Sequence, residues 1–198
     1  MKVAPTLDLE LTAMAHGGSA LGRHEGRVIF VPYAIPGERV RVELVEEHQR
    51  WARARLVEIL RPSPHRVRPP CPYFGQDKCG GCQWQHIDYE EQLRLKAEVM
   101  ADQLQRIGGL EVAVEEPIGA AEPWSYLNHV QFYITEDGHL GFLTADSRDV
   151  IPVEECYIIE PLLDDLWNAL DMYWPVSYTH LRAHETVLDL VCRLLLEK

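Results

Sequence analysis

The sequence predicts an α+β fold, with a small closed β-barrel at the N-terminus and a second antiparallel β domain farther along the chain. Three observations predict it: short strand-like stretches fill residues 6–60, one strong helical pattern follows a cysteine-rich stretch, and strand patterns return after residue 112. We therefore expect four segments, which are a barrel at 1–62, a cysteine-rich loop and helix at 63–110, an incomplete central β domain at 111–175 and an unrelated tail at 176–198.

The barrel is predicted from four stretches that alternate apolar and polar residues or gather β-branched and aromatic ones. They read "TLDLELTAMA", "GRVIFVPYA", "ERVRVELVEE" and "RWARARLVEIL". The turn signals "HGGSALG" and "IPGE" separate them. Several short antiparallel strands with glycine turns are typical of a small closed barrel. The proline-rich, basic stretch "RPSPHRVRPPC" then predicts an extended linker.

A helix is expected directly after the cysteine-rich stretch. Asp88 can cap it, with Glu91 three residues later as its capping-box partner. The apolar residues at helical spacing are Leu93, Ala97, Met100, Leu104 and Ile107. The pair of glycines at 108–109 ends the pattern.

The central β domain is predicted from "HVQFYI", a turn at "EDGHLG" and the short stretch "DVIPV". An amphipathic helix, "EPLLDDLWNALDMY", is expected to start near Glu160.

The last stretch, from Val176 to Lys198, resembles translated sequencing adapter rather than protein. "VSYTHLRAHET" resembles one frame of a transposon-type adapter, and "DLVCRLLLEK" resembles its flow-cell end. We therefore exclude 176–198 from the fold prediction as a read-through artefact. The alternative is a genuine short helix, because "TVLDLVCRLLLEK" is amphipathic. If the artefact interpretation holds, Cys192 has no role and four cysteines remain.

The charge distribution is uneven along the chain. The net charge of −12 argues against a nucleic-acid partner, but residues 1–69 hold eleven Lys and Arg against eight Asp and Glu. This asymmetry is a weak indication of nucleic-acid contact through the N-terminal end, and its alternative is simply two solvated surfaces. No apolar run reaches the roughly 18 residues that span a bilayer, and the N-terminus lacks a signal-peptide pattern. We expect a cytoplasmic chain in a reducing compartment, without membrane contact.

Three cysteines lie close together in "CPYFGQDKCGGCQWQH", where Cys79 and Cys82 form a C-x-x-C pair eight residues after Cys71. Thiolates are soft ligands that suit zinc or iron–sulfur clusters. The fourth ligand could be His86, which gives a Cys3His zinc site, or Cys156, about seventy residues later. A thioredoxin-type redox pair and unliganded buried thiols are weaker alternatives. Spacing alone leaves zinc and a cluster equally favoured.

The stretch from Cys71 to Leu110 resembles the iron–sulfur segment of the bacterial RNA (uracil-5-)-methyltransferases. In that family a cysteine-rich loop and "CGGC" precede a helix that reads "QH…Y…QL…K", as here. The stretch "HGGSALGRHEGRVIFVPYAIPGERVRVEL" is similar to the family's TRAM domain, an OB-like RNA-binding barrel. "WSYLNHVQFYI…GHLGFL…DVIPVEECYI" is similar to its central β domain. The resemblance covers residues 6–165.

The resemblance implies a [4Fe–4S] cluster held by Cys71, Cys79, Cys82 and Cys156, with His86 outside it. It also implies RNA as the substrate, ribosomal RNA first and transfer RNA second, and S-adenosylmethionine as the methyl donor. We expect a monomer in which the cluster has a structural or RNA-docking role. The candidate phosphate contacts are the barrel arginines Arg23, Arg27, Arg50, Arg53 and Arg55.

Trp51 and Tyr33 are candidate stacking surfaces for RNA bases, although both aromatic rings could equally fill the core. The alternative for the arginines is a solvated strand face. The family usually has Arg-Asn-Lys where this chain reads Leu127-Asn128-His129, so no RNA contact is carried over to that point.

The Rossmann-like methyltransferase domain of the family has no counterpart in this sequence. That domain carries the family's nucleophilic cysteine, its acidic general base and its S-adenosylmethionine site. No catalytic or cofactor-binding residue is therefore assigned. We expect an N-terminal, inactive fragment of the enzyme. The competing functions are a non-catalytic RNA-binding module with structural zinc and, less favoured, an iron–sulfur radical enzyme, whose C-x3-C-x2-C spacing is absent.

Overall fold

The computed structural model describes residues 6–135, 138–146 and 149–169, together with the backbone of 187–191, and divides the chain into two compact units. The first unit comprises Met1–Pro70 and Gln83–Gly119, and the second comprises Cys71–Cys82 and Ala120–Lys198. The expected segment 63–110 is therefore shared between them: its cysteine loop belongs to the second unit and its helix to the first.

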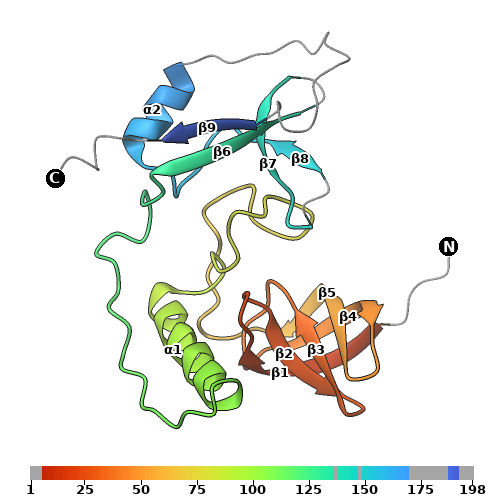
Figure 1. Cartoon of the computed structure of the whole chain (residues 1–198). Coiled ribbons are helices and arrows are strands. Elements are labelled where there is room, and N and C mark those ends of the chain that lie inside the picture. The colour runs from red at the N-terminus through yellow and green to blue at the C-terminus, as the bar shows by residue number, and fades with distance from the viewer. Residues whose placement is uncertain (1–5, 136–137, 147–148, 170–186, 192–198) are drawn as a thin grey trace. The chain divides into compact units, whose positions relative to one another are not determined.

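The first unit contains a closed five-stranded barrel with strand order β1-β2-β3-β5-β4, which confirms the predicted barrel (Figure 1). Its strands are β1 (Thr6–Met14), β2 (Ala20–His24), β3 (Arg27–Val31), β4 (Arg39–Glu47) and β5 (Trp51–Arg61). Neighbouring strands run antiparallel except β3 and β5, whose parallel pairing completes the barrel. Side chains alternate between the barrel interior and solvent, so Val40, Val42, Ala52 and Ala54 are buried.

Strand β2 occupies a stretch that the sequence indicated only as a glycine turn. Gly22 lies in this strand opposite Leu11, and a Cβ atom there would come within 2.5 Å of Leu9 Cγ. The glycine thus permits a close approach between β1 and β2 instead of a reversal of the chain. The turn itself is confined to the residues before Ala20.

Helix α1 (Tyr89–Arg106) begins as predicted, because the Asp88 carboxylate accepts a hydrogen bond from the Glu91 backbone N–H at 2.9 Å. The predicted apolar face is only partly correct, because Leu93, Ala97 and Leu104 are half-buried but the other two residues are not. Met100 is 57% exposed and Ile107 is 77% exposed, whereas Glu91 and Leu95 are buried. Leu95 belongs to the core of the barrel unit, and the half-buried Val99 packs against that core. The helix therefore packs against the barrel through a narrow row of side chains, Leu95 and Val99, which are four residues apart.

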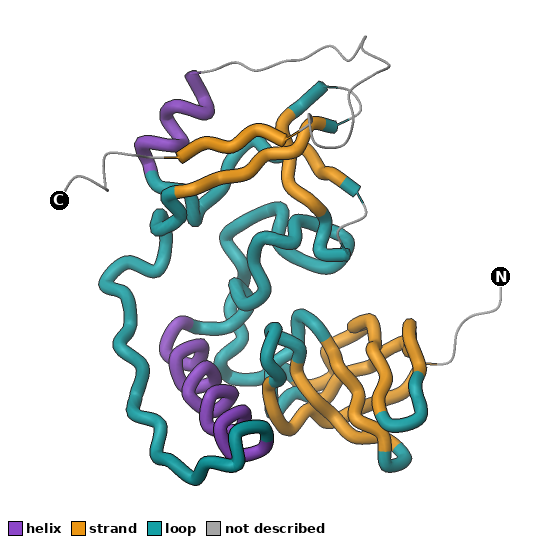
Figure 2. The backbone as a smooth tube through the Cα atoms, viewed as in Figure 1, coloured by secondary structure: helices purple, strands orange, loops and turns teal. Residues whose placement is uncertain are grey.

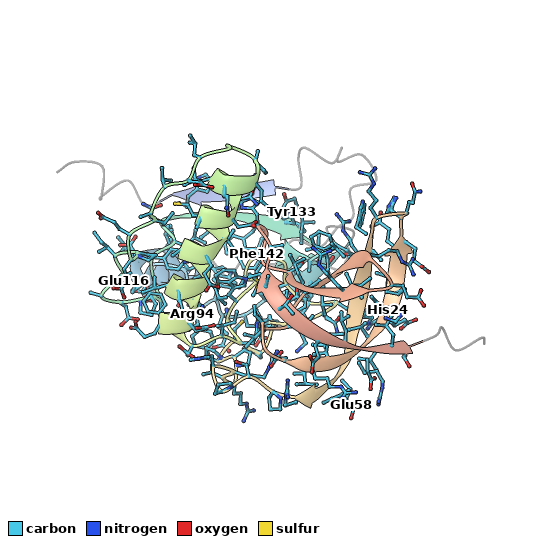
Figure 3. All side chains as sticks on the ribbon, turned by 90° about the horizontal axis from the view of Figure 1, so that it is seen from below. His24, Glu58, Arg94, Glu116, Tyr133 and Phe142 are labelled. Atoms are coloured by element: carbon cyan, nitrogen blue, oxygen red, sulfur yellow. The ribbon has the colours of Figure 1, made fainter. Side chains whose placement is uncertain are left out.

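The second unit contains an antiparallel sheet of order β8-β7-β6-β9, covered by helix α2 (Pro161–Ala169) (Figure 1). Its strands are β6 (His129–Ile134), β7 (Leu140–Leu143), β8 (Val150–Pro152) and β9 (Val187–Val191). The ring of Phe132 stacks on Phe142, which Figure 3 labels, at 5.0 Å between centroids, and lies 4.7 Å from the ring of Trp167 on α2. These aromatic contacts form the small core of this unit.

Strand β9 lies within the segment that the sequence indicated as adapter-derived. It pairs with β6 from His129 opposite Val191 to Tyr133 opposite Val187. The short helix that was the alternative for this stretch is thus replaced by a strand over 187–191, and the rest of 176–198 lies outside the described residues. The origin of the tail remains a prediction from its sequence.

A long loop joins α1 to β6 and has no helix or strand between residues 107 and 128 (Figure 2). The strand pattern expected from residue 112 onward therefore starts later, at His129. Among the described helices, none is long and apolar enough to cross a membrane.

Candidate functional site

A groove of about 740 Å³ lies in the barrel unit, on the outer surface of β1, β2, β3 and β5. Outward-facing residues line it because alternate side chains of these strands point away from the core. Arg23 and Arg53 supply positive charge, and Phe30 and Trp51 supply aromatic surface. The last turns of α1 add Gln103 and Arg106 as a further part of the wall. The groove thus combines cations and rings.

The five predicted arginines do not form one cluster. Arg23 on β2 and Arg53 on β5 line the groove, as just described. Arg27 donates to the Glu47 carboxylate at 2.7 Å and is not among the groove-lining residues. Arg50 lies at the exposed turn between β4 and β5, and Arg55 is exposed on β5 opposite Glu43. Only two of the five therefore share a recess.

The indole of Trp51 is surrounded by other side chains. The His48 ring stacks on it at 4.0 Å between centroids with an interplanar angle of 23°, and Phe30 meets it edge-on at 6.1 Å. The Arg53 guanidinium lies 5.5 Å from the indole centroid, a cation–π arrangement. The neighbouring side chains therefore hold Trp51 in place as part of the groove wall, and Trp51 does not belong to the barrel core.

Glu46 connects the two groups that flank this indole. Its Oε1 atom lies 2.8 Å from His48 Nε2, and its Oε2 atom accepts from Arg53 Nη1 at 3.2 Å. The hydrogen bond to His48 is the main cause of a lowered Glu46 pKa, and the charge of Arg53 adds to it. Glu46 is therefore ionised at neutral pH and places a negative charge at the groove's edge.

The loop between β1 and β2 forms one end of the groove through His16, Gly17 and Ser19. Gly18 in this loop has φ = +88°, and a Cβ atom there would lie 2.7 Å from Trp84 Nε1. The Trp84 indole N–H donates to the Gly18 carbonyl at 3.3 Å. A glycine is required here on both counts, and Trp84 holds the loop in place.

Tyr33, the other predicted stacking residue, lies away from the groove at the join between barrel and linker. Its ring is 6.5 Å from that of His86, and its carbonyl accepts from Arg66 Nη2 at 3.0 Å. The same guanidinium binds Glu38, a carboxylate with no exposed surface. Burial raises the Glu38 pKa, but the Arg66 bonds and the N–H donors of Ser63 and Ile35 outweigh it, so the pKa is lowered.

His86 is also in this join, which removes the main support for a Cys3His zinc site. The imidazole is 1% exposed, and its Nε2 atom lies 3.4 Å from the Ala34 carbonyl oxygen. Burial, together with the nearby Arg66 charge, lowers the pKa of His86 to about 4. The ring is therefore a neutral core group of the barrel unit.

All four candidate cysteines belong to the second unit, although Cys156 is far from the others in sequence. The Cys loop pairs with the end of β7: Gly80 N–H donates to Leu143 O, and Ala145 N–H donates to Lys78 O, both at 3.0 Å. A Cβ atom on Gly80 would lie 2.9 Å from the Thr144 carbonyl, so this close pairing depends on glycine.

Tyr73 anchors the loop toward the fourth cysteine. Its hydroxyl accepts from the Glu154 N–H at 3.2 Å, two residues before Cys156, and its ring packs against the sheet core. Cys79 N–H donates to the Tyr73 carbonyl at 3.1 Å. One tyrosine therefore links the loop that carries three thiols to the segment that carries the fourth.

The thiols interact electrostatically with one another. Burial, then the neighbouring Cys82 and Cys79, raises the pKa of Cys156 to about 11, although the Ile158 and Ile159 N–H groups oppose this rise. Burial is also the main cause of a raised Cys79 pKa, to which Cys71 contributes, while the Gly81 N–H, 3.4 Å from its sulfur, opposes it. These couplings connect all four cysteines in one group, which we call the thiol quartet.

The thiol quartet is not arranged around a single metal ion in the described part of the chain. Within residues 6–135, 138–146 and 149–169, no three or more His, Cys, Asp or Glu side chains are arranged to hold one metal ion. The quartet is nevertheless an all-sulfur donor set, half-buried, with a backbone N–H directed at one sulfur. All-sulfur donor sets occur both in structural zinc sites and in iron–sulfur clusters.

Sequence reasoning missed the groove residue Arg106, and also Glu46, which does not line the groove but pairs with the lining residue Arg53. Arg106 was not predicted because it lies more than forty residues after the barrel in the sequence. Nothing in the helical pattern indicated that the end of the helix lies beside the groove. Glu46 looked like one polar residue of an alternating strand. The basic residue in the last helical turn was a weak signal for Arg106.

Comparison with known proteins agrees with this architecture. Residues 2–57 match the TRAM domain family. An uncharacterized RNA methyltransferase of Caldanaerobacter subterraneus is 39% identical over 165 residues, which are 82% of this chain and 36% of the relative. One from Streptomyces avermitilis is 37% identical over 202 residues, covering 92% of this chain and 47% of the relative.

A solved structure is also similar. The tRNA (uracil-54, C5)-methyltransferase of Pyrococcus abyssi, in complex with S-adenosyl-L-homocysteine, matches with a TM-score of 0.55 and 25% identity, over 82% of this chain and 35% of that protein. The chain thus spans about a third to a half of the length of the relatives it matches. By its barrel and its relatives, the chain belongs to the TRAM-containing RNA methyltransferase family.

Proposed function

We propose that this chain is the RNA-docking part of an S-adenosylmethionine-dependent RNA (uracil-5-)-methyltransferase that acts in the cytoplasm on ribosomal or transfer RNA. The observation that carries the proposal is the groove in which Arg23, Arg53 and Arg106 surround the Trp51 and Phe30 rings. Guanidinium groups bind phosphates, and aromatic rings offer surfaces for unstacked bases. Single-stranded RNA presents both.

In this reaction class a thiolate adds to C6 of uracil, C5 takes the methyl group from the sulfonium, and a base removes the C5 proton so that the thiolate leaves. We assign none of these steps to the described residues, because the four thiols form the quartet. The methyl-transfer site would lie in the part of the longer relatives that this chain does not span. The chain alone should therefore bind RNA without methylating it.

We further propose that Cys71, Cys79, Cys82 and Cys156 hold a [4Fe–4S] cluster. The all-sulfur donor set, its half-buried position and the Gly81 N–H near Cys79 support it. When bound, the cluster would supply a rigid crosslink between the Cys loop and the segment after β8, and RNA methylation needs no redox step from it. Tyr73 and Gly80 would keep the two segments in register without the cluster.

RNA binding is tested by fluorescence anisotropy with a labelled single-stranded uridine oligomer, using Arg53→Gln and Arg55→Gln. Both arginines are exposed on β5, but only Arg53 lines the groove, so the pair is a matched control for charge. We expect Arg53→Gln to weaken binding and to reduce the salt slope by about 0.7 to 1, with a smaller effect of Arg55→Gln. Equal effects, or wild-type protein that does not bind, would refute the groove as the interface.

The cluster is tested by anaerobic purification followed by absorbance and by iron, sulfide and zinc analysis. A brown protein with broad absorbance near 400 nm, about four irons per chain and loss of iron in Cys156→Ser would support the proposal. Colourless protein containing zinc would favour the alternative, a non-catalytic RNA-binding module with structural zinc. Turnover by the pure chain with RNA and S-adenosylmethionine would refute the placement of catalysis outside it.

A further inference from the structure

The edge of the groove holds a charge arrangement that RNA binding by itself does not explain. Arg53 is the groove cation that lies over the Trp51 ring, where a phosphate next to a stacked base would be bound. Its guanidinium already has an anionic partner, since Glu46 Oε2 accepts from Arg53 Nη1 at 3.2 Å. The charge of this groove cation is therefore partly neutralised by Glu46.

Glu46 is held in this position by a second contact. Its other oxygen lies 2.8 Å from His48 Nε2, and the His48 ring stacks on Trp51. Because both oxygens are engaged by groups that contact the same indole, the carboxylate cannot rotate away from Arg53 without losing the His48 contact. This carboxylate, whose side chain is 41% exposed, uses one of the guanidinium N–H donors that an incoming phosphate oxygen would need.

We infer that Glu46 is a built-in competitor for the RNA phosphate at Arg53, which lowers the groove's affinity for polyanions and makes binding depend on the base that stacks beside it. This inference rests on the proposed RNA-docking function. A bare phosphate gains only the contact it takes from Glu46, so the exchange is nearly neutral. A nucleotide that also contacts the aromatic wall gains surface that the carboxylate cannot match.

The neighbouring residue offers a matched control. Glu47 follows Glu46 on β4 and pairs with Arg27 at 2.7 Å, and neither Glu47 nor Arg27 lines the groove. Glu46→Gln and Glu47→Gln therefore change the net charge identically and remove one arginine ion pair each, and Glu46→Gln also alters the His48 contact. A general gain in positive charge acts on both variants, whereas release of the groove cation acts on Glu46→Gln alone.

The experiment measures the dissociation constant and salt slope for a labelled single-stranded uridine oligomer with wild type, Glu46→Gln, Glu47→Gln and Glu46→Gln/Arg53→Gln. We expect Glu46→Gln to bind about two- to fivefold more tightly, with a salt slope steeper by about 0.7. Glu47→Gln should stay close to wild type, and the double variant should lose the gain. Inorganic polyphosphate, which has no bases, should bind more tightly to Glu46→Gln by a similar factor, because it displaces the same carboxylate from Arg53.

Three outcomes would overturn the inference. Weaker binding of Glu46→Gln would mean that Glu46 positions Arg53 for RNA, and an equal gain in Glu47→Gln would mean a general charge effect. An unchanged double-variant gain would show that Arg53 is not the cation released. Thermal melting of each variant checks that the fold is kept. Wild-type protein that fails to bind RNA at all would refute the proposed function instead, so the two failures are distinguishable.

Discussion

Arg66 forms a two-point ion pair with Glu38: Nε lies 2.6 Å from Oε1, and Nη2 lies 2.7 Å from Oε2. Glu38 has no exposed surface, and the Arg66 side chain is 20% exposed. The carboxylate also accepts from the Ile35 and Ser63 N–H groups. The pair fastens the linker after β5 to the loop between β3 and β4, so the linker that was predicted as extended is anchored to the barrel.

Breaking this pair should destabilise the barrel unit strongly. Glu38→Gln leaves Arg66 without its anionic partner in a largely buried place, and loss of one partner of a buried pair costs about 3–5 kcal/mol. Urea unfolding followed by circular dichroism measures it. Glu58→Gln is the control, because Glu58, labelled in Figure 3, pairs with Arg41 at 2.7 Å on the exposed surface. Its loss should cost about 0–1 kcal/mol. Similar losses in both variants would contradict the assignment.

Stability should fall as the pH drops from about 6.5 towards 4 because of His86. The pKa of His86 is lowered from 6.5 to about 4 in the folded chain, so the unfolded chain binds the proton first. The stability is fully present above the unfolded pKa and is lost progressively as pH falls toward the folded one, by up to about 3 kcal/mol. The slope of unfolding free energy against pH, compared between wild type and His86→Gln, isolates this effect. An equal slope in the two proteins would rule His86 out.

Gly80→Ala should disrupt the thiol quartet, whereas Gly81→Ala should not. The new Cβ at residue 80 would lie 2.9 Å from the Thr144 carbonyl and force the loop off β7, while at residue 81 the nearest atom, Cys79 Sγ, is at an ordinary 3.5 Å. Iron content after reconstitution should fall only in Gly80→Ala. In the metal-free protein, faster reaction of the thiols with a disulfide reagent gives a second readout. Identical behaviour of the two variants would show that the pairing does not matter.

Arg106→Gln should weaken RNA binding through the helix wall of the groove. Arg106 is 65% exposed, lines the groove and pairs with Asp102 at 2.8 Å. Arg61 is similarly exposed, pairs with Glu10 at 3.6 Å and lies outside the groove, so Arg61→Gln is its control. We expect the salt slope to shrink by about 0.7 to 1 for Arg106→Gln. If Arg61→Gln has the same effect, the helix does not contribute to the interface.

Sequence patterns were sufficient for the barrel, because period-two alternation in residues 38–60 leaves one face buried and one solvated. They also located the Asp88 cap, which depends on residues only three apart. They failed for the buried face of α1, since Leu95 and Val99 are no more apolar than Leu93 and Met100. The choice between these faces is made by the barrel surface, which no local pattern contains.

The same limit applies to the candidate site. The resemblance to the methyltransferases named the cysteines, but no spacing rule could group Cys156 with a loop more than seventy residues earlier. Arg23 and Arg53 were predicted from charge alone, and so were Arg27, Arg50 and Arg55, which the structure puts elsewhere. The two groups of arginines differ in whether their strand positions face the groove beside α1. That depends on barrel closure and on helix packing, both of which are long-range.

The chain passes between its two units at residues 70, 82 and 119, and this has a consequence for its synthesis. Cys71, Cys79 and Cys82 leave the ribosome more than seventy residues before Cys156. At about 5–20 residues per second, the first three thiols wait several seconds for the fourth. During that interval the barrel strands are already complete, so the nascent protein would present a folded barrel joined to an open, three-thiol site. If the proposed cluster were delivered at that stage, one of its positions would stay unfilled until Cys156 had emerged.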